Sequence, residues 1–527
     1  MATASVADRR VAATAAASGR PEAAWGILAA LAVAKILTHL PAMTQYDYFR
    51  DELYYLASTE HLGFGYVDHP PLSIAVLAVV RALLGDSLPA LRLVPLLAGV
   101  AVVVMCGLLA REMGGGRAAQ GLAGLAALVS PMYLAIHHYY SMNALDHLVW
   151  TAAALLMARL MRRDGAAGWP MLGLVLGLGL LNKISTLWLG LGLAAGIVLT
   201  QRRRWIASRG PWVAALIAFA LFAPHIAWQA AHDWPTLEFV RNATTQKMVA
   251  TSLGPFLMDQ ILSMNPATAP LWIGGLAWCL WPRGDGAPWR LFGVAFLAVF
   301  ALLAFSGTAR ASYMGPAYPM LFAPGSVALE AAARRGGWRR ALRPALVAAM
   351  VIVGALLAPF GLPLLPPDTF LAYMKRIGIE PSAEERGARA QLPQQFADMF
   401  GWDEMASKVA AAWNALPEED RARGAVFAQN YGEAGALDVL GRRLGLPPVS
   451  SGHNSYWMWG PTHPDPHVIV VLGGDEEDNR MYFEELTRVD TIECPRCMPY
   501  ERDLGVYVGR GPKMPLAEAW PRLKNFI

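Results

Sequence analysis

Long apolar runs recur along the whole chain, and they limit the folds that it can adopt. Each run has about 15–20 residues, the length that a helix needs to cross a hydrocarbon core about 30 Å thick. Only 16% of the 527 residues are charged, whereas a typical soluble domain has about 25%. The sequence therefore predicts a polytopic α-helical membrane protein with about eleven transmembrane helices. The predicted spans are 23–41, 92–109, 118–135, 147–161, 169–181, 184–200, 211–229, 267–281, 289–305, 313–329 and 345–360.

A further apolar run, 71–85, is too short to cross. As a helix it would extend only about 22 Å, and it contains Arg81. We therefore expect it to lie on the outer membrane face as an amphipathic helix.

Basic residues fall in alternate loops, and this pattern predicts the orientation. They include Arg9, Arg10 and Arg20; Arg111 and Arg117; Arg162 and Arg163; Arg202, Arg203, Arg204 and Arg209; Arg283 and Arg290; and Arg334, Arg335, Arg339, Arg340 and Arg343. The positive-inside rule then puts the N-terminus in the cytoplasm. The net charge of +4 consequently reflects membrane topology and does not indicate nucleic-acid binding. An odd number of spans leaves everything after about residue 361 outside the cytoplasm.

The two ends of the chain differ in character from the apolar middle. Residues 1–22 are rich in Ala, Ser and Arg and predict a disordered cytoplasmic tail. A cleaved signal peptide over 1–42 is the alternative, which Lys35 and His39 disfavour. Residues 23–360 would form the transmembrane domain, with a first outer loop over 42–91.

Residues 361–527 carry more charge and more proline, and alternating segments predict a small α/β domain outside the membrane. The predicted helices are 396–416 and 432–445. The predicted strands are 425–431, 467–473 and 504–511.

An acidic stretch, residues 46–72, directly follows the first predicted span. It contains Asp47, Asp51, Glu52, Glu60 and Asp68. Carboxylates held at a membrane face are energetically costly, so they indicate a functional site. The alternative is a solvated polar loop that happens to be acidic.

Further polar residues are expected at the same face. They include Asn143 and Asp146 after the third span, Lys183 between two apolar runs, Lys247 in the loop 230–266, and Arg310 after the ninth span. A site with one base and cations for an anionic leaving group has this composition. His137 and His138 resemble a metal pair, but adjacent residues point in different directions on a helix.

Four cysteines occur in the chain. Cys106 and Cys279 lie in apolar runs and are expected to be buried. Cys494 and Cys497 form a C-P-R-C pair in the outer domain, where a disulfide is plausible. A zinc site would require a second pair, which the sequence lacks.

Several motifs together resemble one family. DELYYLA (51–57), GYVDHPPL (65–72), ALRLVPLLAG (90–99) and LLNKISTLWL (180–189) look like the bacterial branch of the protein-mannosyltransferase-like membrane glycosyltransferases. That family has the GT-C fold and includes protein O-mannosyltransferases and the aminoarabinose transferase that acts on lipid A. The tail, with SSGHNSYWMWGP (450–461) and PLAEAWPRLKNFI (515–527), looks like the outer domain of many bacterial members.

The resemblance implies a sugar donor carried on a polyprenyl phosphate, in the cytoplasmic membrane of a bacterium. It implies that an acid of the Asp-Glu pair is the catalytic base, here Asp51 with Glu52 beside it. Asp68 takes the position of a metal-linked glutamate of some relatives, and His69 replaces a lysine, so a divalent metal ion at Asp68 and His69 stays open. Either Asn143 or Asp146 takes the role of a second-loop acid. Lys183 would face the lipid phosphate.

The residue types fit the implied chemistry. A glycosidase needs two carboxylates, one of which protonates a poor leaving group. A sugar phosphate leaves as an anion and needs no acid, so one base with cationic or metal stabilisation is enough. We therefore expect an inverting transferase that moves a monosaccharide to a lipid, glycan or protein acceptor at the outer face. Lys183, Arg310 and Lys247 would stabilise the departing phosphate.

Other interpretations stay open. Asp51 and Glu52 could merely stabilise a helix N-terminus over 51–61, Lys183 could snorkel from a helix end, and Arg310 and Lys247 could be ordinary interfacial charges. A transporter or flippase for a lipid-linked or polar solute is the alternative function. It should have repeats and polar groups near the bilayer midplane, and no internal repeat is visible. A catalytically inactive scaffold is a third alternative.

Overall fold

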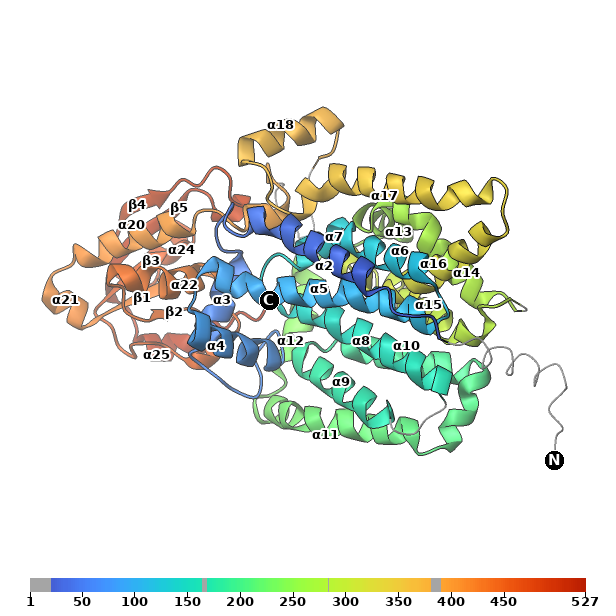
Figure 1. The fold of residues 1–527 in the computed structure, drawn as a ribbon. Coiled ribbons are helices and arrows are strands. Elements are labelled where there is room, and N and C mark those ends of the chain that lie inside the picture. Colours follow the sequence, from blue (N-terminus) through green and yellow to red (C-terminus); the bar gives the residue numbers. More distant parts are fainter. Residues whose placement is uncertain (1–19, 164–167, 283, 381–389) are drawn as a thin grey trace.

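The structure is a computed structural model, and it describes residues 20–163, 168–282, 284–380 and 390–527. A helical bundle and a smaller C-terminal domain lie end to end (Figure 1). Most of the tail predicted over 1–22 lies outside the described residues.

The bundle consists of the helices that the apolar runs predicted, together with α13, which forms inside the predicted loop 230–266. Each predicted run contains a helix, although the run 118–135 is interrupted at Val129 and Ser130. The helices are α2 (Trp25–His39), α5 (Leu88–Glu112), α6 (Arg117–Leu128), α7 (Pro131–Ile136), α8 (Met142–Arg163), α9 (Gly168–Asn182), α10 (Thr186–Val198), α11 (Gly210–Ala231), α13 (Leu253–Ser263), α14 (Ala269–Leu280), α15 (Arg290–Ala304), α16 (Pro319–Arg334) and α17 (Arg339–Gly361).

These helices are unequal in length. In the part of the chain that the structure describes, six helical segments are long and apolar enough to cross a membrane. They are Trp25–Ala42, Leu88–Glu112, Met142–Arg163, Gly210–Ala231, Ala287–Ala304 and Arg339–Gly361. Several other helices are shorter, and α9 and α10 are strongly apolar. The fold is thus a polytopic helical membrane fold, as predicted.

The short run 71–85 forms α4 (Leu72–Leu84), whose 13 residues extend about 20 Å. It lies at the end of the bundle that faces the C-terminal domain (Figure 1). Beside it lies α3 (Arg50–Ser58), which carries the acidic pair of the first loop. A second pair of short elements, α12 (Pro235–Asn242) and the π-helical turn η3 (Ala243–Lys247), follows α11. We call this end of the bundle the domain end.

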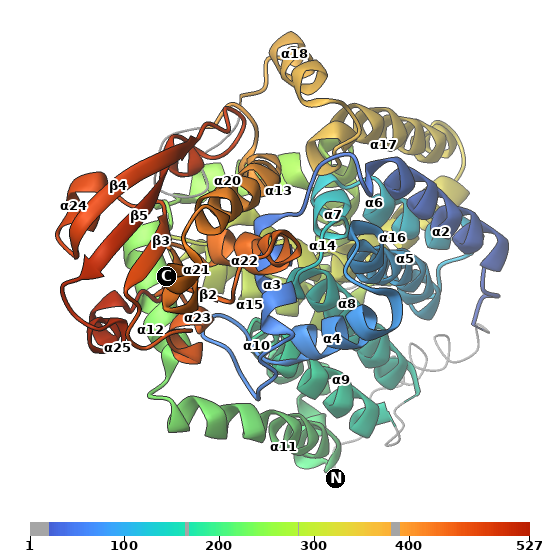
Figure 2. The same cartoon turned by 90° about the vertical axis from the view of Figure 1, so that its left-hand side faces the viewer.

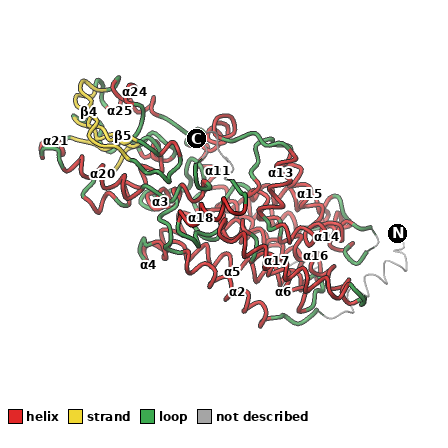
Figure 3. Tube along the Cα trace, turned by 90° about the horizontal axis from the view of Figure 1, so that it is seen from above, coloured by secondary structure: helices red, strands yellow, loops and turns green. Residues whose placement is uncertain are grey.

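The C-terminal domain contains a five-stranded sheet with the order β2-β1-β3-β5-β4. The strands gather at one end of the molecule (Figure 3). β1 pairs in parallel with β2 and β3, whereas β5 runs antiparallel to β3 and β4. The strands are β1 (Gly424–Ala428), β2 (Val449–Ser450), β3 (Val468–Leu472), β4 (Phe483–Ile492) and β5 (Leu504–Pro512).

The predicted strands 425–431, 467–473 and 504–511 correspond to β1, β3 and β5, and the small α/β domain is confirmed. The residues after Ala428 leave β1 and begin α22 (Tyr431–Val439). The predicted helix 396–416 is divided into α19 (Gln394–Ala397) and α20 (Trp402–Asn414), with Gly401 at positive φ between them. The 3₁₀ turn η7 (Gly441–Leu444) follows α22.

The C-terminal domain packs directly on α3, and the two share one hydrophobic cluster. Viewed from the domain end, α22 lies over α3 (Figure 2). Two glycines of α22 permit this close approach. A Cβ atom at Gly435 would lie 2.9 Å from the Leu53 carbonyl carbon and from the Tyr54 nitrogen, and one at Gly432 would meet the Arg50 side chain.

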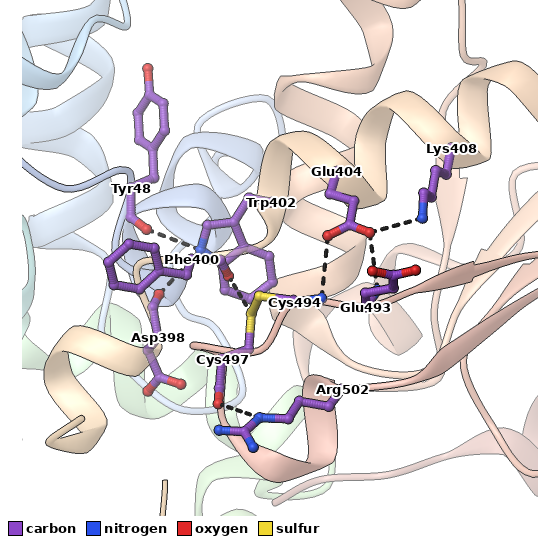
Figure 4. The surroundings of a disulfide bond; sticks show 10 residues. All are labelled: Tyr48, Asp398, Phe400, Trp402, Glu404, Lys408, Glu493, Cys494, Cys497 and Arg502. Carbon is purple, nitrogen blue, oxygen red and sulfur yellow. Dashed lines mark hydrogen bonds and ion pairs between the residues drawn. A yellow bond between two sulfur atoms is a disulfide. The ribbon is translucent and has the colours of Figure 1, made fainter. Parts of the chain in front are cut away.

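A disulfide joins Cys494 to Cys497, as the sequence suggested. It lies against Gly401, where a Cβ atom would meet both sulfurs. Next to it, the Trp402 indole donates to the Tyr48 carbonyl oxygen, 3.0 Å away, and Figure 4 shows this arrangement. The disulfide therefore packs beside Gly401 and Trp402, where the domain contacts the segment that leads into α3.

Candidate functional site

The candidate site lies where α3 meets the C-terminal domain. The first turn of α3 contains Asp51 and Glu52. Acidic residues suit this position, because the helix N-terminus carries partial positive charge. The Phe49 nitrogen donates to Glu52 Oε2 at 2.9 Å, which closes the turn. The expected helix over 51–61 is thus α3 (Arg50–Ser58), and its two acids have different surroundings.

Glu52 is fully buried and paired with the equally buried Arg92. Arg92 Nη2 lies 3.1 Å from Glu52 Oε2, and the Tyr140 nitrogen donates to Glu52 Oε1 at 2.8 Å. Arg92 also donates to the carbonyl oxygens of Met43 and Asp47. Arg92 Nε is the fourth donor, 3.4 Å from Glu52 Oε1. This carboxylate ties the start of α3 to Arg92 and Tyr140 and is not exposed to a substrate.

Asp51 is the accessible member of the pair, with 31% of its side chain exposed. The Tyr431 hydroxyl donates to its Oδ1 at 3.1 Å, and Arg50 Nε lies 3.9 Å from the same oxygen. Burial raises the pKa of the Asp51 carboxyl. Arg50, Lys247 and the Tyr431 hydroxyl lower that pKa, and Asp68 raises it, so all four groups lie near Asp51.

Arg50 is held by groups from the C-terminal domain. Its Nη1 donates to the Tyr500 hydroxyl at 2.7 Å, its Nη2 lies 3.6 Å from Asp398 Oδ2, and its guanidinium lies 5.3 Å from the centroid of the Tyr431 ring. Local sequence patterns gave no signal for Tyr431, Tyr500 or Asp398, because they lie about 350–450 residues from Arg50 and meet it only through tertiary packing.

Asp68 and His69 follow α3 in the same loop. Tyr54 donates to Asp68 Oδ1 at 2.9 Å, and His69 Nε2 lies 3.9 Å from that oxygen. Among the residues that the structure describes, no group of three or more His, Cys, Asp or Glu side chains could hold a metal ion. Asp68 and His69 therefore do not complete a three-ligand site, and a metal at this pair stays a prediction.

A second polar group surrounds Lys183, in the turn between α9 and α10. Lys183 Nζ donates to Asn143 Oδ1 at 2.6 Å and lies 3.9 Å from Asp146 Oδ2. Ser185 donates to the same Asp146 oxygen at 2.9 Å. Burial lowers the pKa of Lys183, Asp146 raises it, and the nearby Arg310 lowers it. The structure thus brings together the four residues predicted for this region, which are Lys183, Asn143, Asp146 and Arg310.

Tyr55 lies between the two groups. Burial raises its pKa well above the usual value, the charges of Asp51 and Asp68 raise it further, and a hydrogen bond with the Met142 backbone lowers it. Met142 immediately precedes Asn143, whose amide contacts Lys183. Tyr55 therefore lies between the carboxylates of Asp51 and Asp68 and the residues around Lys183, at the domain end of the bundle.

His137 and His138 directly follow α7, and both are buried. The His137 ring lies 5.2 Å from the His147 ring and 5.7 Å from the Tyr133 ring. Among the described residues, His137 and His138 belong to no group of three or more ligating side chains that could hold a metal ion.

Comparisons with known proteins agree with this architecture. A protein-family model described as dolichyl-phosphate-mannose-protein mannosyltransferase matches residues 68–228. No curated protein sequence matches the chain.

Solved structures share the fold over most of the chain. ArnT from Cupriavidus metallidurans in the apo state has a TM-score of 0.61 at 15% identity, covering 92% of this chain and 98% of ArnT. The same protein bound to undecaprenyl phosphate has a TM-score of 0.59 at 15% identity, with the same coverage of both chains. The arabinofuranosyltransferase AftD from Mycobacteria has a TM-score of 0.51 at 15% identity, covering 92% of this chain and 40% of AftD.

The resemblance seen in the motifs is thus confirmed: residues 68–228 match the mannosyltransferase family model, and the chain has the fold of the GT-C membrane glycosyltransferases.

Proposed function

We propose that this protein is an inverting glycosyltransferase that moves a monosaccharide from a polyprenyl-phosphate donor to an acceptor at the outer face of a bacterial cytoplasmic membrane. One observation carries the proposal. An accessible carboxylate, Asp51, lies beside cations at one end of a membrane bundle, near a second cationic group around Lys183. ArnT, whose fold this chain shares, has been solved with undecaprenyl phosphate bound, and this supports a lipid-linked donor.

Asp51 is the proposed general base. As the acceptor oxygen or nitrogen attacks the anomeric carbon, Asp51 takes its proton. The new bond forms on the face opposite the bond to phosphate, which breaks and leaves its electron pair on the phosphate oxygen. The configuration of the anomeric carbon is therefore inverted. General-base assistance of this kind typically contributes about 10²–10⁴-fold to the rate.

Lys183 is the proposed cation for the donor phosphate, with Arg310 and Lys247 as further charges. Asn143 holds the ammonium through a direct hydrogen bond of 2.6 Å, whereas Asp146 lies 3.9 Å from it. We therefore assign the orienting role in this loop to Asn143 and a charge-balancing role to Asp146. Fixed cations stabilise the charge that develops on a leaving phosphate.

Glu52 takes a positioning role in this proposal and not a proton-transfer role. Both of its oxygens accept hydrogen bonds, from Phe49, from Arg92 in α5 and from Tyr140, so it fixes the turn that presents Asp51. No step is routed through a metal at Asp68 and His69, and chelation tests that prediction directly.

The proposed orientation puts the N-terminus in the cytoplasm and the C-terminal domain outside. The alternating basic loops support it, and so does the disulfide of the C-terminal domain, since disulfides persist in oxidising compartments.

The test uses the full chain in nanodiscs with a panel of polyprenyl-phosphate sugars. We expect wild-type protein to release free polyprenyl phosphate and Asp51→Asn to lose about 10²–10⁴-fold of that rate. Asp86→Asn is the matched control, because Asp86 forms an exposed ion pair with Arg443 and should keep the wild-type rate. A parallel series with EDTA decides whether a metal is needed.

The transporter alternative gives a different pattern. It predicts movement of a lipid-linked or polar solute across the bilayer without cleavage of the sugar phosphate. If folded wild-type protein binds no donor of the panel, the transferase proposal is wrong.

A further inference from the structure

The C-terminal domain contributes a side chain to the proposed base. Tyr431 is the first residue of α22, and its hydroxyl donates to Asp51 Oδ1 across 380 positions of sequence. Helices α3 and α22 are therefore joined by a hydrogen bond at the Asp51 carboxylate as well as by apolar packing.

Tyr431 is held firmly enough to orient another group. Its side chain is buried, and its ring lies 4.9 Å from the Tyr54 ring and 4.9 Å from the His453 ring. The Tyr431 nitrogen lies 3.4 Å from His453 Nδ1, and His453 Nε2 lies 2.9 Å from the Ile527 carbonyl oxygen. This arrangement fits a histidine that accepts from Tyr431 and donates to Ile527.

The start of α22 is fixed as well. The Asn430 side chain accepts from the nitrogens of Gly432 and Glu433 at 2.8 and 3.0 Å, which caps the helix. A Cβ atom at Gly435, one turn after Tyr431, would touch the α3 backbone. Helix α22 therefore has little freedom to move relative to α3.

Two contacts converge on one oxygen of the Asp51 carboxylate. Among the described residues, Tyr431 and Arg50 both approach Oδ1. These two contacts at one oxygen orient the carboxylate. A carboxylate fixed at one oxygen presents the other in a defined direction, which is the geometry that general-base catalysis requires.

We propose that Tyr431 is a positioning residue of the transferase, and that the C-terminal domain completes the active site by orienting the Asp51 carboxylate through this hydroxyl. The inference rests on the function proposed above, and it adds a role for a domain that lies outside the segment matching the family model.

The groups around Asp51 determine how loss of the Tyr431 hydroxyl shifts the pH dependence of the rate. The groups that act on Asp51 are Arg50 from α3, Asp68 from the following loop, Lys247 from η3 and Tyr431 from α22. The Tyr431 hydroxyl stabilises the ionised carboxylate, so it lowers the Asp51 pKa. Removing the hydroxyl raises that pKa, and the acidic limb of the rate profile moves to higher pH.

The test compares Tyr431→Phe with Tyr456→Phe. Tyr456 is the matched control, because it is buried in the same domain and its hydroxyl also donates to a carboxylate, Asp438, at 2.8 Å. For Tyr431→Phe we expect kcat for polyprenyl-phosphate release to fall about tenfold or more with the donor KM unchanged. We expect the acidic limb of kcat to move up by about one pH unit. Tyr456→Phe should change neither quantity.

A second measurement does not depend on turnover. The Asp51 carboxyl is titrated by infrared spectroscopy, as the difference between spectra with Asp51 and with Asp51→Asn, in the wild-type and Tyr431→Phe backgrounds. We expect the apparent pKa to be about one unit higher in Tyr431→Phe.

The outcomes separate the two proposals. An unchanged titration in folded Tyr431→Phe overturns the positioning role, whatever the activity. If the Asp51 titration shifts but the wild-type protein releases no polyprenyl phosphate, the contact between Tyr431 and Asp51 is supported and the proposed function is contradicted. A wild-type kcat and pH profile in Tyr431→Phe would also refute the role of this residue.

Discussion

Replacing Gly435 by alanine should separate α22 from α3 and thereby slow the reaction. A Cβ atom at this position would lie 2.9 Å from two backbone atoms of α3, whereas ordinary van der Waals contacts begin at 3.4 Å. Backbone atoms cannot rotate away as the end of a side chain can. The substitution therefore requires a displacement of about 0.5 Å between the helices.

That displacement is enough to break the contact with the base. Tyr431 lies one turn before Gly435 on the same face of α22. A shift of about 0.5 Å would lengthen its bond to Asp51 from 3.1 Å to about 3.6 Å, at which a side-chain hydrogen bond no longer exists.

The magnitudes follow from these distances. Overpacking typically costs about 1–3 kcal/mol, and alanine recovers about 0.5–1 kcal/mol of that in a helix interior. We expect a net loss of about 1 kcal/mol in stability. Because a misplacement of about 1 Å can cost about 10²-fold in rate, we expect about a tenfold loss here.

The assay measures release of polyprenyl phosphate, thermal unfolding by tryptophan fluorescence, and hydrogen exchange of the α3 and α22 amides. Gly254→Ala is the control, because Gly254 lies in α13 and an added Cβ atom there meets nothing within 4 Å. It should keep the wild-type rate. The reasoning is refuted if Gly435→Ala keeps the wild-type rate and exchange protection.

Two further predictions concern buried charges. Arg92→Met should lower stability by about 3–5 kcal/mol, because it leaves Glu52 charged and unpaired in a fully buried site. Thermal unfolding measures this, and a wild-type melting temperature would contradict it. Burial raises the pKa of the Glu501 carboxyl above its usual 4.5, so the folded protein holds a proton that the unfolded chain releases. This stabilisation is fully present below a pH of about 4.5 and is lost as the pH rises through the higher folded-state pKa. Glu501→Gln should flatten the fall in melting temperature with pH, and an unchanged slope would argue against the shift.

The membrane part of the fold could be predicted from local pattern. Spanning helices need continuous apolar length, so each predicted run contained a helix. The sheet was only partly predictable. β1 and β3 are almost entirely buried and apolar, but six of the ten residues of β4 are exposed, and β2 has only two residues. Neither β4 nor β2 has a periodicity that the sequence could reveal.

The candidate site was also only partly predictable from the sequence. Asp51, Asn143, Asp146 and Lys183 stand out because polar residues are rare beside apolar runs. The pairing of Glu52 with Arg92 and of Asp51 with Tyr431 depends on tertiary packing. One sequence without the fold offers no signal for contacts between such distant positions.

The distance in sequence between Asp51 and Tyr431 has a consequence for biogenesis. The two residues are 380 positions apart, and ribosomes add about 5–20 residues per second. A newly made chain therefore contains Asp51 about 20–80 s before Tyr431 exists. Under the proposed orientation, Tyr431 must also cross the membrane before it can reach Asp51. The proposed transferase consequently lacks this orienting contact during its own synthesis, and it reaches its full rate only when the C-terminal domain has been exported and folded.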